Sequence, residues 1–535
     1  MWTRRGFLAG AAAGLPAQDG RAVEVRVIDG ETRRPTAARV RLIDAHGRDI
    51  APIGHPPEPD PKGMQGDVLF HGKRYSYVNG GFAVRPDQLP LRYVAIKGFE
   101  YEYAEGTIPA PDPLGNPADI RLAKWSAWKR RGWLAGDTHI HHISPHTCKL
   151  EMEAEDLDVA NILTSDFTSD EHEFEGRLNR NSTRDRLIYV SQEFRHNHLG
   201  HISMLNLKKL IRPVRPMRKE HFPLHLDACD NARKQGGYVA WAHFPSWPGL
   251  ENPLDVALEK LDGVELLCVL DPREFPVFVR SVVPELAAND GLRLWYRYLN
   301  CGFRLTAVAG TDKMTNWVTA GANRVYAKVD GEFTYGNWIA ALKRGATFVS
   351  NSPLMTFTVD GRQSGSVIDV NGKERKARIH AEAESQLPYD RLEIVANGTV
   401  VHDATPSGPR NRSVIQMEYP VDRSCWIAAR VVEDLGKYRA RRVDFTGVHS
   451  AAGTRHGDFF GTRRPETVFA HTTPVYVLHD GRPIRSAEDA GYWIRYLEAS
   501  RAWLDKNGNF ARPSDKKATL EAFEAGIAAY RRRMP

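Results

Sequence analysis

The stretch RGWLAGDTHIHHISPHT, residues 131–147, places four histidines within eight positions, shortly after Asp137. So much imidazole suits neither an apolar core nor a helix. In a β-strand, side chains two positions apart point to the same face of the sheet. His139 and His141 can therefore reach one ion from the end of a strand. The stretch predicts one edge of a metal site.

The region around this stretch, from about residue 128 to 352, alternates apolar strand-like runs with helical ones. The strand-like runs are WLAGDTHIHH, LDVANILTSDF, LIYVSQEF, GHISMLNL, YVAWAHF, VELLCVL and RLTAVAGTD. Continuous apolar strands that alternate with helices indicate a mostly parallel sheet covered by helices. Seven such strands favour a distorted (β/α)7 barrel over an open sheet.

The segments on either side of the barrel show the period-two alternation of short antiparallel strands. Residues 21–109 predict a β-sandwich that resembles the regulatory-type sandwich found beside carboxypeptidases, and residues 353–480 predict a second one. Residues 481–535 are helical in pattern. The expected fold class is therefore multidomain α/β plus all-β, with the barrel flanked by N-terminal and C-terminal β-sandwiches.

The first residues, MWTRRGFLAGAAAGLPAQDG over 1–20, place Arg4-Arg5 before a short apolar run that ends in small residues. This order is typical of a twin-arginine export signal and predicts a periplasmic or secreted protein. A basic N-terminus without a signal function is the alternative. The run is about half as long as a membrane span requires, so we expect no stable membrane insertion.

The overall composition restricts the class of partner. The 535 residues include 73 basic and 66 acidic ones, a net charge of +7, without a basic block. Nucleic-acid binding is therefore not expected, and a small-molecule substrate is. The five cysteines are scattered and form no CxxC pair, which argues against a disulfide framework. The chain also lacks the G-x-S-x-G and P-loop motifs.

Metal-capable side chains recur where the predicted strands begin or end. Eleven of the 20 histidines lie between residues 139 and 243. In α/β barrels the active site lies at the carboxyl ends of the strands, so residues distant in sequence converge there. The candidates in chain order are His139, His141, Asp166, Glu193, His201, His243 and Asp312.

Several motifs together resemble the PHP (polymerase and histidinol phosphatase) metallohydrolase superfamily. They are GDTHIHH, MEAEDLDVANIL, EFRHNHLGH, YVAWAHF and AGTD. The resemblance is greatest to the CehA/McbA-type, carbaryl-hydrolase-like branch. Two further segments, GATFVSNSP and VFAHTTPVYV, resemble the downstream part of that branch.

This resemblance implies a set of metal ligands: His139, His141, Glu193, His201, His243 and Asp312. Asp166 is either a ligand or a supporting residue. The resemblance also implies that Asp137 orients a ligand imidazole, and His146 is a candidate to replace a missing ligand. Phe167 and Met314 stand where many PHP proteins have histidine. We therefore expect two ions bridged by Glu193 rather than three, with a single ion as the alternative.

A set of imidazole and carboxylate ligands suits Zn, Mn or Fe. Such ions lower the pKa of bound water from about 15.7 to about 7 and so activate it for hydrolysis. The resemblance implies a hydrolase acting on phosphoesters, with carbamates or carboxyl esters as the alternative, and the N-terminal segment implies that it is exported. A third possibility is a non-catalytic protein with a degenerate barrel that binds carbohydrate or cell-envelope polymer. His198 or His142 is a candidate proton donor, and Lys313 a candidate phosphate contact.

Overall fold

The computed structural model describes residues 22–57, 63–70, 72–110, 112, 116–126, 128–165, 170–212, 219–245, 249–268, 271–273, 290–371, 375–436 and 467–535. The predicted export signal over residues 1–20 and the candidate ligand Asp166 lie outside the described residues. In the described part of the chain, no helix has both the length and the apolar character needed to cross a membrane.

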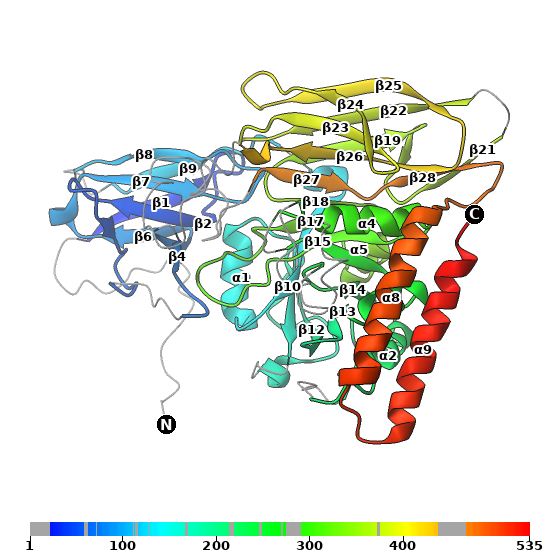
Figure 1. Ribbon diagram of the computed structural model, residues 1–535. Coiled ribbons are helices and arrows are strands. Elements are labelled where there is room, and N and C mark those ends of the chain that lie inside the picture. Colours follow the sequence, from blue (N-terminus) through cyan, green and yellow to red (C-terminus); the bar gives the residue numbers. More distant parts are fainter. Residues whose placement is uncertain are drawn as a thin grey trace.

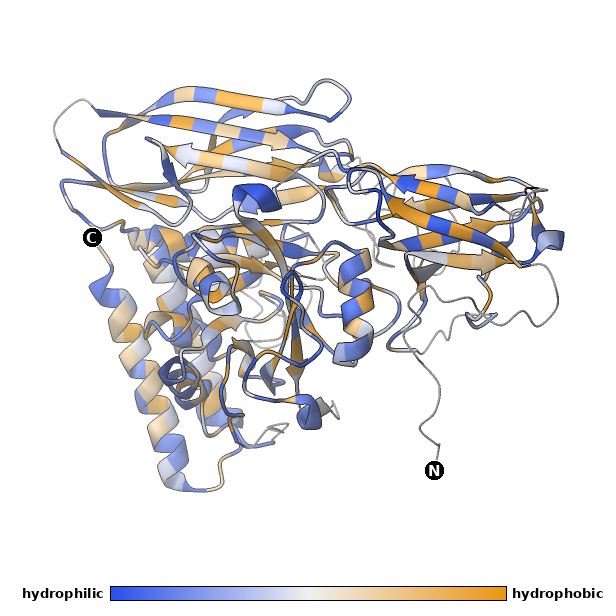
Figure 2. Cartoon of the chain, turned by 180° about the vertical axis from the view of Figure 1, so that it is seen from behind, coloured by the Kyte–Doolittle hydropathy of each residue, from blue (hydrophilic) through white to orange (hydrophobic). Residues whose placement is uncertain are grey.

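The N-terminal part consists of two small sheets, drawn in blue in Figure 1. Their strands are β1 (Val23–Asp29), β2 (Ala37–Ile43), β3 (Asp49–Ile50), β4 (Val68–Phe70), β5 (Lys73–Asn79), β6 (Gly81–Val84), β7 (Leu91–Ile96), β8 (Ala104–Ile108) and β9 (Ala118–Leu122). The order is β6-β1-β9 in one sheet and β4-β5-β2-β7-β8 in the other, where β3 pairs with β2. Alternate residues such as Val25 and Val40 face a shared apolar core. Figure 2 shows the resulting stripes of hydrophobic and hydrophilic residues.

The centre of the molecule is a long mixed sheet of fifteen strands. Its first half follows the order β16-β15-β14-β13-β12-β11-β10-β17-β18. These strands are β10 (Trp133–Ile140), β11 (Val159–Thr164), β12 (Leu187–His196), β13 (Gly200–Leu205), β14 (Tyr238–Trp241), β15 (Gly263–Leu267), β16 (Thr306–Ala309), β17 (Arg324–Lys328) and β18 (Thr347–Ser350). Nearly every residue in them is buried, because both faces of the sheet are covered.

The expected (β/α)7 barrel is wrong. Strands β12 and β13 pair antiparallel, as do β13 with β14 and β10 with β17. The cause lies in the connections: β12 ends at His196 and β13 begins at Gly200. A parallel pair needs a crossover of about a dozen residues or more, so this short turn forces a hairpin. In the described residues, strands predominate and helices are few.

The C-terminal β-structure is continuous with the central sheet, because β18 pairs with β27. The sheet continues through β27 (Phe469–Thr472), β26 (Cys425–Val432), β23 (Arg391–Ala396), β24 (Thr399–Ala404), β28 (Val475–His479) and β21 (Val367–Val370). A separate four-stranded sheet contains β20 (Arg362–Gln363), β19 (Leu354–Val359), β22 (Arg375–Glu384) and β25 (Ser413–Val421). Leu354 and Ile379 of this sheet share one core with Ile394 and Ile427 of the large sheet. One layer of the C-terminal part is therefore an extension of the central sheet.

Seven α-helices are described, most of them packed against the central sheet. They are α1 (Pro145–Ala154), α2 (His225–Lys234), α3 (Asn252–Ala257), α4 (Gly291–Asn300), α5 (Tyr335–Lys343), α8 (Ala487–Asn507) and α9 (Pro513–Arg532). Short 3-10 helices occur at Pro86–Gln88, Lys129–Arg131 and Asp170–Glu173. Helices α8 and α9 lie side by side at one edge of the molecule (Figure 1).

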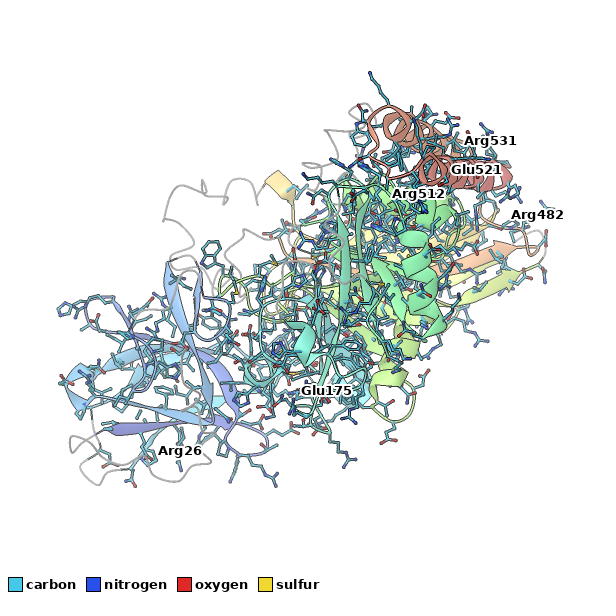
Figure 3. All side chains as sticks on the ribbon, turned by 90° about the horizontal axis from the view of Figure 1, so that it is seen from below. Arg26, Glu175, Arg482, Arg512, Glu521 and Arg531 are labelled. Atoms are coloured by element: carbon cyan, nitrogen blue, oxygen red, sulfur yellow. The ribbon has the colours of Figure 1, made fainter. Side chains whose placement is uncertain are left out.

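Many charged side chains lie on the periphery, including several of the C-terminal helices. Figure 3 shows Glu521 and Arg531 on α9, Arg512 just before it, and Arg26 at the far end of the molecule. Helix α8 begins with the Ser486 hydroxyl accepting a hydrogen bond from the backbone N–H of Asp489, which satisfies a free donor of the first turn. Most of the imidazoles of the central sheet, by contrast, are buried.

Candidate metal centre

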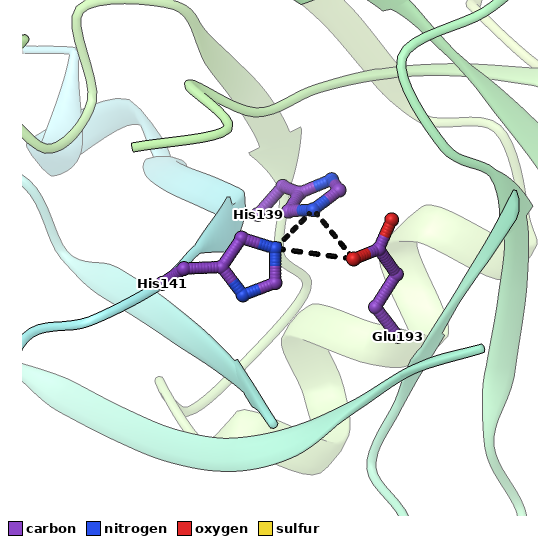
Figure 4. A group of neighbouring side chains, drawn as sticks. All are labelled: His139, His141 and Glu193. Atoms are coloured by element: carbon purple, nitrogen blue, oxygen red, sulfur yellow. Dashed lines mark hydrogen bonds and ion pairs between the residues drawn. The ribbon is translucent and has the colours of Figure 1, made fainter. Parts of the chain in front are cut away.

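His139 and His141 are brought together by the end of β10. Both side chains are fully buried, and their Nε2 atoms face each other at 2.9 Å. The strand places them on one side because they are two positions apart. Figure 4 shows both rings turned toward Glu193.

Glu193 of β12 lies between two pairs of imidazoles. Its Oε2 lies 3.2 Å from His141 Nε2 and 3.7 Å from His139 Nε2. Its Oε1 lies 3.1 Å from His201 Nδ1 and 3.4 Å from His243 Nε2. The second pair is itself in contact, with His201 Nδ1 3.0 Å from His243 Nε2. One carboxylate therefore faces two separate groups of nitrogen atoms.

Asp312 adds a second carboxylate to the first group. Its Oδ1 lies 3.6 Å from His139 Nε2 and 3.7 Å from His141 Nε2. It follows β16, which places it beside the end of β10 through the close approach of Gly310 to His139. The side chain is 23% exposed, whereas Glu193 is 1% exposed. Asp312 is therefore the ligand candidate at the open side of the group.

Hydrogen bonds to the remote ring nitrogens fix the orientation of the first pair. His141 Nδ1 lies 2.7 Å from the carbonyl oxygen of Leu163. Because a carbonyl only accepts, His141 carries its proton on Nδ1 and presents a lone pair on Nε2. His139 Nδ1 lies 2.9 Å from Glu265 Oε2. Both rings thus have a hydrogen-bond partner on Nδ1, as metal-ligating imidazoles usually do.

Glu265 of β15 is a functional candidate that the sequence reasoning missed. Besides His139 Nδ1, it accepts hydrogen bonds from the backbone N–H of His243 and from the hydroxyls of Thr138 and Ser203. A signal was present, because an acidic residue inside the apolar run VELLCVL is buried and needs polar partners. Cys268, which directly follows β15, also lies near His139 and Glu265.

Asp137 supports the backbone and not an imidazole. Its carboxylate accepts hydrogen bonds from the N–H groups of His139, Thr311 and Gly321 and from the Thr311 hydroxyl. Burial raises the pKa of Asp137 to about 6. Its role is to join the end of β10 to the loop that carries Asp312.

The two candidate proton donors lie in different surroundings. His198 contacts His221, with its Nδ1 2.9 Å from His221 Nε2, and its ring packs 5.0 Å from that of Trp503. His142 is half-buried, with its ring 6.1 Å from that of His141. Only His142 is thus described in ring contact with one of the converging histidines.

Lys313 directly follows Asp312, but its side chain contacts other groups, and His146 lies on α1. The Lys313 ammonium is buried, donates to the carbonyl of Val318 at 2.6 Å and pairs with Glu151 at 3.2 Å. It is therefore engaged inside the protein and does not serve as the predicted phosphate contact. His146 is exposed in the first turn of α1.

The electrostatics of the group follow from burial and close charges. Burial lowers the pKa of His201 to about 3, which keeps its ring neutral and able to ligate. Burial also opposes charge on His139, but Glu265 and Glu193 outweigh it and raise the pKa of His139 well above its ordinary value. Burial by itself would raise the pKa of Glu193. The charge of His139 and hydrogen bonds from the neighbouring rings outweigh burial, so the pKa of Glu193 lies well below the usual range.

No protein-family model matches the chain, and no curated protein matches it. The class of site therefore rests on the residues themselves. Buried imidazoles and carboxylates converge here, and such a donor set can hold metal ions.

Proposed function

We propose that this protein is a metal-dependent hydrolase whose centre binds two divalent transition-metal ions. The position of Glu193 is the observation that carries this proposal, because each of its oxygens faces its own pair of imidazoles. A carboxylate that bridges two ions needs this arrangement. The same residues belong to the motifs that resemble the PHP superfamily, and we propose a relationship to it on that basis.

The ligand sets would be unequal. His139, His141 and Asp312 would hold one ion, and His201 and His243 the other, with Glu193 shared. Imidazole and carboxylate donors suit Zn, Mn or Fe. The second set is smaller and leaves more room for water or substrate. Bound ions of this kind activate water and stabilise the charge that develops on a substrate oxygen.

The protein's own residues orient this chemistry and favour an anionic substrate. Glu265 holds the His139 ring, and Asp137 holds the loop that carries Asp312. Arg195 lies with its Nε 3.7 Å from Glu193 Oε2 and is 17% exposed. A guanidinium beside the centre suits a phosphoester better than a neutral carbamate. His142 is the proposed donor of a proton to the leaving group.

The substrate class is tested by turnover. Protein stripped with a chelator should be inactive and should regain hydrolysis of an aryl phosphate when Mn or Zn is added. His139→Ala should lose bound metal and turnover together, whereas His380→Ala on β22, outside the converging group, should keep both. Hydrolysis of an aryl carbamate but not of the phosphate would identify carbamates or carboxyl esters as the substrate class. Absence of turnover on both substrates would contradict it.

Export by the twin-arginine route belongs to the proposal and rests on the order of residues around Arg4-Arg5. Replacement of both arginines by lysine should retain the protein in the cytoplasm of an expressing bacterium. Unchanged recovery in the periplasm or the medium would contradict this part of the proposal.

A further inference from the structure

A second group of metal-ligating side chains lies between α2 and α3, outside the centre described above. It consists of His225, Glu251 and Asp255, each 0% exposed. One ligand atom from each lies within 4.8 Å of the others, and His225 Nδ1 lies 3.8 Å from Glu251 Oε2. None of the three belongs to the strand-end positions that predicted the first centre.

The local structure explains why these side chains meet. His225 is the first residue of α2, and Glu251 immediately precedes α3. Asp255 is four positions after Glu251, so both carboxylates lie on one face of α3. The second oxygen of Glu251 accepts the backbone N–H of Leu226 at 3.2 Å, which joins the two helices.

The important feature of this group is its buried polar atoms without partners. Neither ring nitrogen of His225 has a hydrogen-bond partner. Glu251 Oε2 and Asp255 Oδ1 find no donor either, and the two carboxyl groups can satisfy each other only through a shared proton. Leaving buried polar atoms in this state is costly, so their concentration in one place requires an explanation. The side-chain oxygen of Asn252 also lacks a partner, and its amide nitrogen lies 3.5 Å from Asp255 Oδ2.

The nearest positive charge acts only from a distance: Lys260 lowers the pKa of Asp255 electrostatically, but its ammonium pairs with Asp230. Within the described part of the chain, no lysine or arginine forms an ion pair with Glu251 or Asp255. Burial raises the pKa of both carboxyl groups well above their ordinary values, and burial lowers the pKa of His225 well below its own. Two buried carboxylates would be stable in ionised form only beside a cation.

We propose that His225, Glu251 and Asp255 form a second, closed site for a divalent transition-metal ion. One imidazole and two carboxylates neutralise such an ion and suit zinc among other metals. Because all three ligands are fully buried, the site has no open position for a substrate. Its role is structural.

The proposed site lies next to the hairpin formed by β12 and β13. The His225 ring packs edge-on against Phe194 at 5.4 Å, and Phe194 is the neighbour of Glu193 on β12. Asn252 lies directly against Gly200, the first residue of β13. An ion between α2 and α3 would therefore steady the hairpin that carries Glu193 and His201.

Metal content tests this site independently of any hydrolytic activity. The double variant His139→Ala/His243→Ala removes ligands from both halves of the first centre. We expect it to retain about one equivalent of tightly bound metal, measured by plasma mass spectrometry. On this background, Asp255→Asn or His225→Gln should lose that equivalent. His471→Gln, an equally buried histidine on β27, should not.

Thermal stability gives a second readout if the triple variants fold poorly. Zinc should raise the melting temperature of the His139→Ala/His243→Ala protein, and a chelator should reverse the change. A folded double variant that binds no zinc and shows no shift would overturn the proposal, and a proton shared by Glu251 and Asp255 would then account for the pair. Neither result depends on whether the first centre hydrolyses anything.

Discussion

At the scale of single residues, Glu265 supports both halves of the centre without being a ligand candidate of the first group. It contacts the His139 ring, the backbone of His243 and two hydroxyl groups. Burial would raise its pKa, but His139 outweighs burial, so the pKa of Glu265 is lowered and the group stays ionised. A single carboxylate thus links the two halves of the centre through their supporting bonds.

Replacement of Glu265 by glutamine should therefore weaken metal binding without removing a ligand. The variant keeps the shape of the side chain but loses the charge that holds the His139 ring. Loss of such support commonly lowers metal affinity by about 10–100-fold. Competition with a chromogenic chelator measures the change. Asp262→Asn, which alters the acid just before β15, is the matched control, and equal affinities in both variants would contradict the assigned role.

Asp312 combines a predicted ligand with an unusual backbone conformation. Its φ of 46° lies in the left-handed region, which asparagine and aspartate tolerate better than alanine. Asp312→Asn should lower metal affinity and leave stability unchanged. Asp312→Ala should lower affinity and also reduce the free energy of unfolding by about 1 kcal/mol. Thermal melts of the metal-free variants separate the two effects, and equal melting temperatures would show that the backbone carries no strain there.

The converging residues illustrate which parts of a site are predictable. His139, His141, Glu193, His201, His243 and Asp312 lie together, as their positions next to strand ends suggested. Hydrogen-bond partners are harder to predict, because they depend on strand order and side-chain direction. Asp137 accepts backbone N–H groups and Lys313 pairs with Glu151, and neither contact has a signature in the sequence.

At the scale of secondary-structure elements, Gly310 controls how closely the loop after β16 approaches β10. A Cβ atom at this position would lie 2.5 Å from His139 Cβ and 2.9 Å from its backbone nitrogen. Gly310→Ala should therefore displace His139, lower metal affinity and cost about 1–3 kcal/mol of stability. Gly336→Ala on α5 is the matched control, because a Cβ there meets nothing within 4 Å. It should stabilise the protein by about 0.4–1 kcal/mol, and a destabilisation equal to that of Gly310→Ala would contradict this account.

The strand pairing shows where the sequence pattern was insufficient. Apolar runs identified seven strands of the central sheet, β10 to β16, but the direction of these strands was inferred from the helices expected between them. The turn between His196 and Gly200 is too short for a helix, and this feature alone indicates a hairpin. The link from β18 to β27 joins segments that are more than a hundred residues apart. Local alternation carries no information about such a pairing.

At the scale of the whole molecule, buried charges join the N-terminal sheets to the rest. Arg39 of β2 pairs with Glu155 at the end of α1 at 2.7 Å, with both side chains nearly inaccessible. Next to this pair, the Lys97 ammonium donates to the carbonyls of Ala37 and Glu153. The two parts of the chain are therefore connected by polar groups that must remain satisfied for the contact to persist.

Lys97 makes this connection dependent on pH. Burial lowers the pKa of Lys97 from 10.5 to about 8. Between these values the unfolded chain binds a proton that the folded protein does not, so stability attributable to Lys97 rises with pH. The full change amounts to about 3 kcal/mol. Urea unfolding of the wild type and Lys97→Met from pH 6 to 10 should show a constant difference below pH 8. Above pH 8, the free energy of unfolding of the wild type should rise relative to that of the variant. Profiles that stay parallel over the whole pH range would mean that the pKa of Lys97 is not lowered by folding.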